Sequence, residues 1–491
     1  MKKKLLMRML CASLSGALLL GGCGSDKANA EDKEERGRMD NSIASAIDNA
    51  TSGEEKAPGT EKEAEPTEAE VPAENETTGD VFAATAANAD QLMAEALEQY
   101  RSGDHTPLDE PVQYNVLWLG FTHVTYEDLD FQMTDFDREY LEAVALNFEK
   151  SLESITDHNL DITVDLHFID DVTSLTKTDG DEWLFLAQDT VQPVIDQYVT
   201  PDTDTVLTTV QTAGEENISR NEDKDGYGTN YVMLGLKTAG IDSYLGYTTF
   251  DLGKPVDGTY PLEDPEIPSL YATAVAVHEW MHQFEYLGKL LDVEYPSTHA
   301  YMGGDSFPGY QEYINGENDY DYFEFYKLVL TGELPYNSGV GTSKVGMYPK
   351  MWPLVKRNVL NAGNFTIKAA DGSGYLSGQI VDPTLTLSKD ACVWNIRYIG
   401  DGRYTFTPME LQDKLIDLGN AWDMEDNTIS LWVYTGYTDA QSWKLPDNGD
   451  GTYSLQTPYE SGRLLTIRDD SAFLCTDGAD GIQDWIIEAA K

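Results

Sequence analysis

Residues 274–286 read Ala-Val-Ala-Val-His-Glu-Trp-Met-His-Gln-Phe-Glu-Tyr, an apolar run that contains two histidines four positions apart. Because residues i and i+4 lie on one face of a helix, His278 and His282 can present two imidazoles to a single metal ion. Glu279 stands next to the first histidine, where a carboxylate can take a proton from water beside the metal. The simpler interpretation is an amphipathic helix with two half-buried histidines. The apolar residues before His278 and the export signal described below favour the metal site.

Signals for a helix start and a helix stop flank this stretch. Pro268-Ser269 is a start signal, and Gly288 is a stop signal. The pattern His-Glu-x-x-His resembles the signature of the zincin metallopeptidases. That resemblance implies an α+β domain, a zinc ion held by His278 and His282, and Glu279 as the catalytic base.

A catalytic zinc site usually takes a third protein ligand and leaves one position open. We expect His299 in this role, because it is the only histidine after His282 and Pro296 can turn the chain back towards the helix. Glu285 shares the helix face of the two histidines, so it is either a ligand or an acceptor that orients an imidazole. The sequence leaves four other candidates for the third ligand: Glu285, Glu312, Glu317 and Glu324.

The first residues have the composition of an export signal. Basic residues at positions 2–4 and at Arg8 precede an apolar run over residues 9–20. The run ends in Leu-Gly-Gly-Cys at residues 20–23, which resembles the bacterial lipobox. The resemblance implies that residues 1–22 are removed and that Cys23 carries a lipid. We therefore expect a cell-surface protein on the extracytoplasmic face of a bacterial membrane, attached only through this lipid.

Residues 23–110 are rich in Glu, Asp, Ala and Thr and poor in aromatic residues. Such a composition cannot bury enough apolar surface to offset chain entropy, so it predicts a disordered acidic tether, with one short helix over residues 91–100.

The whole chain has a formal net charge of −53. That charge argues against nucleic acid as a partner and against direct adhesion to anionic lipid.

Residues 111–360 alternate apolar runs of strand and helix type. The spacing predicts a buried strand over residues 115–121, a helix over residues 136–155 that starts at Thr134-Asp135, and a strand over residues 161–169. This order resembles the N-terminal subdomain of zincins. Residues 221–226 read Asn-Glu-Asp-Lys-Asp-Gly, which we interpret as a turn; a structural calcium ion is the alternative, although the complete EF-hand pattern fails.

Residues 363–491 contain three related units. Gly-Asn-Phe-Thr-Ile, Gly-Arg-Tyr-Thr-Phe and Gly-Thr-Tyr-Ser-Leu recur at residues 363, 402 and 451, and each unit leads to a tryptophan: Trp394, Trp443 and Trp485. The last two tryptophans belong to Gln-x-Trp motifs. This arrangement resembles a ricin-type β-trefoil, which implies an all-β carbohydrate-binding domain whose tryptophans are core residues.

One of the three units keeps the residues of a sugar site. Asp417 and Trp432 match the Asp that binds ring hydroxyls and the aromatic platform of the family. The third unit has Thr466 and Cys475 at these positions, and the first has Ser388 in place of the platform. The resemblance therefore implies one working site, in the middle unit.

Four cysteines occur in the chain. Cys11 leaves with the signal peptide and Cys23 takes the lipid, so Cys392 and Cys475 remain. In an exported protein such a pair suggests a disulfide. The two residues fall at different points of different units, so two buried free thiols are the equal alternative.

Two functional hypotheses remain. The first is a surface-anchored zinc endopeptidase that cleaves proteins or glycoproteins and is targeted by a glycan-binding trefoil. The second is a non-catalytic glycan-binding lipoprotein with an inactive zincin-like scaffold.

Overall fold

The computed structural model describes residues 77–177, 184–212, 231–233, 247–251, 272–302, 309–310, 322–338, 342–378, 384–410, 414–418, 423–433 and 439–490. The predicted signal peptide, Cys23, the first part of the tether, the turn at residues 221–226, Glu312 and Glu317 lie outside these residues. Among the described residues, no helix combines the length and the apolar character needed to cross a membrane.

A mixed β-sheet forms the centre of the N-terminal half. Its strand order is β4-β1-β8-β10-β9, with only β9 antiparallel to its neighbour. The strands are β1 (Val112–Phe121), β4 (Leu160–Ile169), β8 (Thr205–Val210), β9 (Tyr231–Met233) and β10 (Tyr247–Asp251). β1 has a parallel neighbour on each side, so both of its faces are buried. This explains why its sequence is almost continuously apolar.

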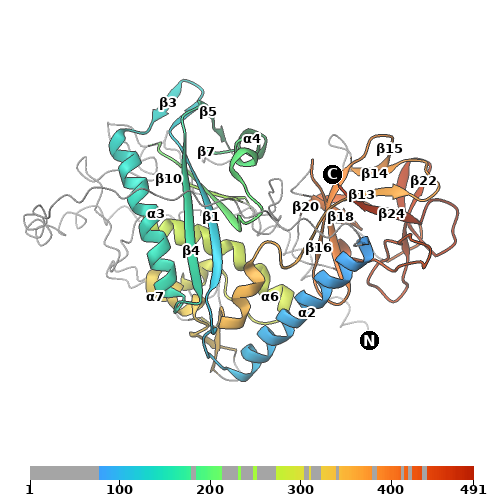
Figure 1. The fold of residues 1–491 in the computed structure, drawn as a ribbon, viewed down its shortest axis with the longest axis horizontal. Helices are drawn as coiled ribbons and strands as arrows, with labels where there is room; N and C mark the ends of the chain where they lie inside the picture. The colour runs from blue at the N-terminus through green and yellow to red at the C-terminus, as the bar shows by residue number, and fades with distance from the viewer. Residues whose placement is uncertain are drawn as a thin grey trace, which may run out of the picture. The chain divides into compact units, whose positions relative to one another are not determined.

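Helices cover both faces of this sheet. Alternate side chains of β1 point to opposite faces. Those on one face join the apolar cluster that includes α3 (Asp135–Ile155) and α5 (Ala272–Met281): Tyr114, Val116 and Trp118. Those on the other face join a cluster with α4 (Gln188–Tyr198): Leu117, Leu119 and Phe121. Figure 1 shows α3 running beside β4 and β1. The sheet thus supports α5, which carries the first histidine.

The predicted start of α3 is confirmed. Thr134 is its N-cap and forms a reciprocal capping box with Asp137. Smaller elements surround the sheet and the helices: β2 (His123–Tyr126), β3 (Leu129–Gln132), β5 (Thr173–Ser174), β6 (Thr176–Lys177), β7 (Leu184–Phe185), η2 (His282–Phe284), α6 (Tyr286–Leu291), η3 (Thr298–Met302), α7 (Tyr322–Leu330), β11 (Leu334–Asn337), β12 (Thr342–Val345) and η5 (Pro349–Val355).

The prediction of disorder over residues 23–110 is wrong for its last part, because helix α2 spans Thr78–Ser102. The predicted short helix is only the second half of α2. Its buried apolar residues recur at helical spacing: Phe82, Ala89, Met93 and Ala96. The centroids of the Phe82 and Phe365 rings lie 5.1 Å apart. Oε1 of Gln99 accepts a hydrogen bond from the backbone N–H of Lys350. Burial of these side chains against other parts of the fold offsets the loss of chain entropy when the helix forms. The average composition of residues 23–110 does not reveal this burial.

The C-terminal half is rich in β-strands, and several strands and isolated β-bridges together close into a ring. β13 (Asn361–Ala369) pairs with β16 (Val393–Tyr398) and β24 (Trp485–Ala489), and β16 continues to β17 (Arg403–Pro408) and β21 (Trp443–Lys444). Bridges from Gln456 to Lys444 and from Tyr453 to Trp485 complete the ring. The remaining elements include three hairpins: β14 (Tyr375–Gly378) with β15 (Leu385–Ser388), β18 (Lys414–Asp417) with β20 (Ser430–Val433), and β22 (Leu464–Arg468) with β23 (Ser471–Cys475). The short elements β19 (Asn427–Thr428) and η6 (Asp439–Gln441) lie between these segments.

The three sequence units occupy equivalent places in this half. Each hairpin pairs one leucine or isoleucine with a leucine of its partner strand: Leu376 with Leu387, Ile416 with Leu431, and Leu465 with Leu474. The three predicted core tryptophans are fully buried: Trp394, Trp443 and Trp485. A ring of strands with three equivalent hairpins is compatible with a β-trefoil.

Candidate metal centre

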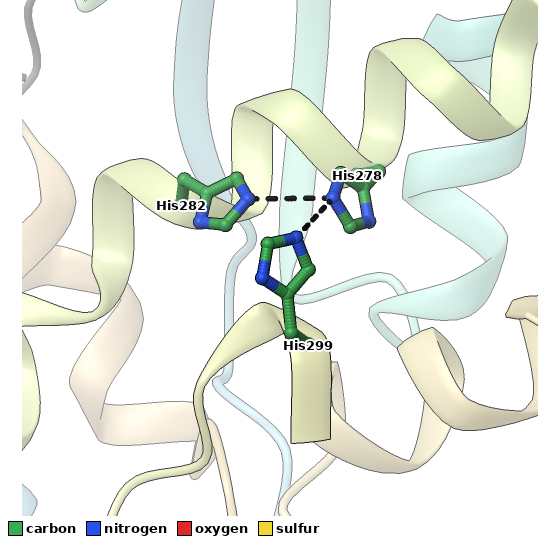
Figure 2. Close-up of side chains that lie close together, drawn as sticks. All are labelled: His278, His282 and His299. Carbon is green, nitrogen blue, oxygen red and sulfur yellow. Dashed lines mark hydrogen bonds between the residues drawn. The ribbon is translucent and has the colours of Figure 1, made fainter. Parts of the chain in front are cut away.

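The two histidines of the His-Glu-x-x-His motif lie one helical turn apart. His278 belongs to α5, and His282 opens η2 directly after it. The predicted uninterrupted helix is therefore divided into α5, η2 and α6. Met281 and Glu285, on either side of η2, keep right-handed helical φ and ψ, so the turn continues and both rings face the same side (Figure 2).

Contrary to the prediction, Gly288 does not end the helix. It lies inside α6, whose C-cap residue, Asp292, adopts the left-handed conformation (φ 51°). A Cβ at Gly288 would lie 2.7 Å from Cβ of Tyr295, so the glycine lets the following loop pack directly on α6. This close approach returns the chain towards α5, and the loop leads into η3. Figure 2 shows His299 pointing from η3 at the other two rings.

The three imidazoles converge through their Nε2 atoms. Nε2 of His278 lies 3.1 Å from Nε2 of His299 and 3.3 Å from Nε2 of His282. One ligand atom from each ring lies within 4.8 Å of the others. A tetrahedral zinc ion with bonds of about 2.0–2.1 Å to nitrogen places its ligand nitrogens about 3.3 Å apart. The spacing therefore fits a three-histidine zinc site.

The outer nitrogens of two rings have partners that fix their orientation. Nδ1 of His282 lies 3.0 Å from Oε1 of Glu285, so this nitrogen donates to the carboxylate. In the neutral ring, Nε2 then carries a lone pair directed at the cluster. Nδ1 of His278 lies 2.8 Å from the hydroxyl of Tyr326 on α7. When this nitrogen donates to the hydroxyl, Nε2 of His278 also presents a lone pair to the cluster, which is the tautomer that a metal ligand needs.

The electrostatics of the rings also suit a metal. Burial, together with the neighbouring His282 and His299, holds the pKa of His278 well below its usual value. Burial and His282 lower the pKa of His299 to about 4. Burial opposes the charged form of His282, but the hydrogen bond and charge of Glu285 outweigh it and raise this pKa. Two of the three rings are thus neutral near pH 7, as ligands must be.

Glu279 is only 2 % exposed, and burial raises its pKa to about 7, with the charge of His282 opposing the rise. A carboxylate with a pKa near neutrality can both accept and return a proton. The sequence placed Glu279 beside the first histidine, but the perturbed pKa depends on the surrounding helices and is visible only in the fold.

The other candidates for the third ligand have different positions. Glu285 contacts the outer nitrogen of His282, the position of the second alternative given for it, an acceptor that orients an imidazole. Glu324 lies exposed on α7, outside the histidine cluster. Sequence reasoning missed Tyr326, whose contact with His278 spans 48 positions of the chain. The only signal for it was the density of tyrosines after His299.

The residues of the expected sugar site come from one hairpin. In the β18–β20 register, Asp417 is opposite Ser430 and Leu415 is opposite Trp432. Asp417 and Trp432 are therefore diagonal neighbours on one face, with Cα atoms about 7–8 Å apart. Asp417 is buried, whereas Trp432 is 54 % exposed. An exposed tryptophan beside a buried carboxylate is a suitable arrangement for a sugar ring.

The equivalent position in the third unit holds a threonine. Nε2 of Gln483 donates to the hydroxyl of Thr466, which stands where the middle unit has Asp417. Cys475, at the platform position, is buried, and both it and Cys392 are free thiols. The alternative of two unpaired cysteines is therefore the one that the structure adopts.

Comparisons with known proteins identify no family: no family model matches the chain, and no curated protein does. Solved structures with similarity include the designed 3-fold symmetric protein ThreeFoil, at 22 % identity over 26 % of this chain and 99 % of that one, with a TM-score of 0.24. SeviL bound to asialo-GM1 saccharide has 15 % identity over 26 % of this chain and 98 % of that one, with a TM-score of 0.22. The Haemophilus ducreyi cytolethal distending toxin has 15 % identity over 26 % of this chain and 88 % of that one, with a TM-score of 0.21. At such TM-scores, the description of the C-terminal half rests on its own strand pairing.

Proposed function

We propose that this protein is a zinc-dependent endopeptidase of the zincin type that acts on proteins or glycoproteins at a bacterial cell surface. The observation that carries the proposal is the convergence of the Nε2 atoms of His278, His282 and His299, with the buried Glu279 next to the first of them in sequence. The lipid anchor on Cys23 is part of the proposal and rests on the lipobox resemblance alone.

The three imidazoles would hold the metal, and Glu279 would act as the base. When bound, zinc polarises a carbonyl group and lowers the pKa of water at its open position. Glu279 takes the proton from the attacking water and passes it to the nitrogen of the leaving amine. Tyr326 and Glu285 keep the rings of His278 and His282 oriented through their Nδ1 atoms.

Zinc content and the variant Glu279→Gln test this function together. We expect about one zinc per chain in the purified protein, and the same content in Glu279→Gln. Peptide cleavage by the variant should fall by at least about 10²-fold, because general base catalysis contributes about 10²–10⁴-fold. Protein without zinc, or a variant with unchanged cleavage, would refute the proposed function, and absence of both zinc and cleavage would favour the non-catalytic lipoprotein.

A second activity, glycan binding, is supported by the exposed Trp432 beside Asp417 in the middle unit. Under this proposal the C-terminal half is a ricin-type β-trefoil that brings the peptidase to glycosylated substrates. Trp432→Ala should abolish binding on a glycan array and leave cleavage of a small peptide unchanged. Ser388→Ala, at the same position of the first unit, is the matched control and should bind like the unsubstituted protein. Equal binding by all three proteins would remove the assigned sugar site.

A further inference from the structure

One carboxylate oxygen accepts hydrogen bonds from two segments that are separate in the chain. Oε1 of Glu285 lies 3.0 Å from Nδ1 of His282 and 2.8 Å from the backbone nitrogen of Thr298. Thr298 immediately precedes His299 and is itself buried. The same oxygen therefore contacts the ring of the second histidine and the backbone beside the third.

The loop between α6 and η3 has another anchor at its beginning. The hydroxyl of Tyr100 donates to the backbone carbonyl of Glu294, and the hydroxyl of Tyr310 donates to Oε1 of the same residue. The bond from Thr298 to Glu285 fixes the end of the loop that is nearest to His299. Removing Glu285 would leave the beginning of the loop attached and would release the end that carries the third histidine.

We propose that Glu285 is the positioning residue that assembles the three-histidine cluster, by holding the ring of His282 and the backbone next to His299 on one oxygen atom. This inference rests on the proposed function, in which the cluster binds zinc. It assigns to Glu285 more than the orientation of one ring: the carboxylate sets the distance between two ligands from different segments. Outer contacts of this kind typically change metal affinity by about 10–100-fold.

The test measures zinc affinity by competition with a chromogenic chelator in the full chain and in three variants. Glu285→Ala removes both bonds, and we expect zinc affinity to fall by about 10–100-fold. Glu285→Gln keeps an oxygen acceptor without the charge, so its affinity should lie between those of the full chain and Glu285→Ala. Glu294→Gln removes a charge from the same loop, but its amide oxygen can still accept from Tyr310, so its affinity should stay within about twofold.

Hydrogen exchange in the metal-free protein separates this inference from the proposed function. The amide of Thr298 should exchange at least about tenfold faster in Glu285→Ala than in the unsubstituted chain, because its acceptor is gone. If the unsubstituted chain binds no zinc, the proposed function fails, while the exchange rate still decides whether Glu285 holds the loop. Unchanged exchange in Glu285→Ala would overturn the inference, and so would unchanged zinc affinity in a chain that binds zinc.

Discussion

Gly288→Ala is the substitution for which helix propensity and tertiary structure predict opposite results. Gly288 lies inside helix α6, and replacing an interior helical glycine by alanine normally stabilises a protein by about 0.5–1 kcal/mol. In this fold, however, the added methyl group would lie 2.7 Å from Cβ of Tyr295 and 3.2 Å from the carbonyl oxygen of Val293. Neither atom is the end of a flexible side chain, so the loop itself must move.

The size of the effect follows from these two contributions. Forcing an extra methyl group into a packed contact typically costs about 1–3 kcal/mol. The gain in helix propensity offsets part of this cost, and we expect a net loss of about 1–2 kcal/mol in the free energy of unfolding. Because the displaced loop leads to His299, zinc affinity should fall in the same variant.

Calorimetric unfolding and a zinc competition titration measure the two effects. A loss of 1 kcal/mol lowers the midpoint by about 1 °C in the compact unit Thr77–Lys491, because the entropy of unfolding grows with the number of residues. Lys289→Ala, at the exposed neighbouring position of α6, is the control and should change stability by less than about 0.5 kcal/mol. A higher midpoint for Gly288→Ala, with zinc affinity unchanged, would refute the inference that the Gly288–Tyr295 contact positions His299.

Three further predictions concern the helix cap, the C-terminal half and the metal. Thr134→Ala should cost about 1 kcal/mol in urea unfolding, because it removes the capping box that begins α3; a cost near zero would contradict the cap. Trp443→Phe should cost about 1 kcal/mol more than Trp485→Phe, because Nε1 of Trp443 donates to the carbonyl of Ile416, whereas Nε1 of Trp485 has no partner among the described residues; equal costs would argue against this hydrogen bond. Adding zinc at about 100 times its Kd to chelator-treated protein should stabilise it by about 2.7 kcal/mol, and His278→Ala should abolish the gain.

Local sequence patterns predicted the helices and strands that are specified by residues close together in the chain. The spacing of apolar residues and the Thr134 cap are contained within a few turns of chain, so α3 was predictable to within one residue of its start. β1 was predictable because a strand with parallel neighbours on both sides must be apolar on both faces. The equivalent positions of the three C-terminal units were predictable because the sequence repeat itself aligns them.

The candidate site was predictable only in part, because its pieces meet through tertiary contacts. His278 and His282 share a helical face, and four-residue spacing is sufficient to place them together. His299 reaches them because Gly288 allows the loop to pack on α6, a contact that no local pattern encodes. Tyr326 approaches His278 from a different helix, so its role could be found only after α7 was placed.

Helix α2 shows why composition misled the prediction for residues 23–110. Averaged over that segment, acidic residues and alanines indicate disorder, whereas the buried face of α2 consists of a few residues at helical spacing. These residues belong to one apolar cluster that also contains Trp118 of the central sheet, Trp352 of η5 and Ile367 of the first C-terminal strand. In the described residues, segments 111–360 and 363–491 therefore both contribute apolar side chains to this cluster. Because α2 contributes to that cluster and its Tyr100 also holds Glu294 in the loop before His299, it is a structural part of the candidate metal centre rather than the end of a tether.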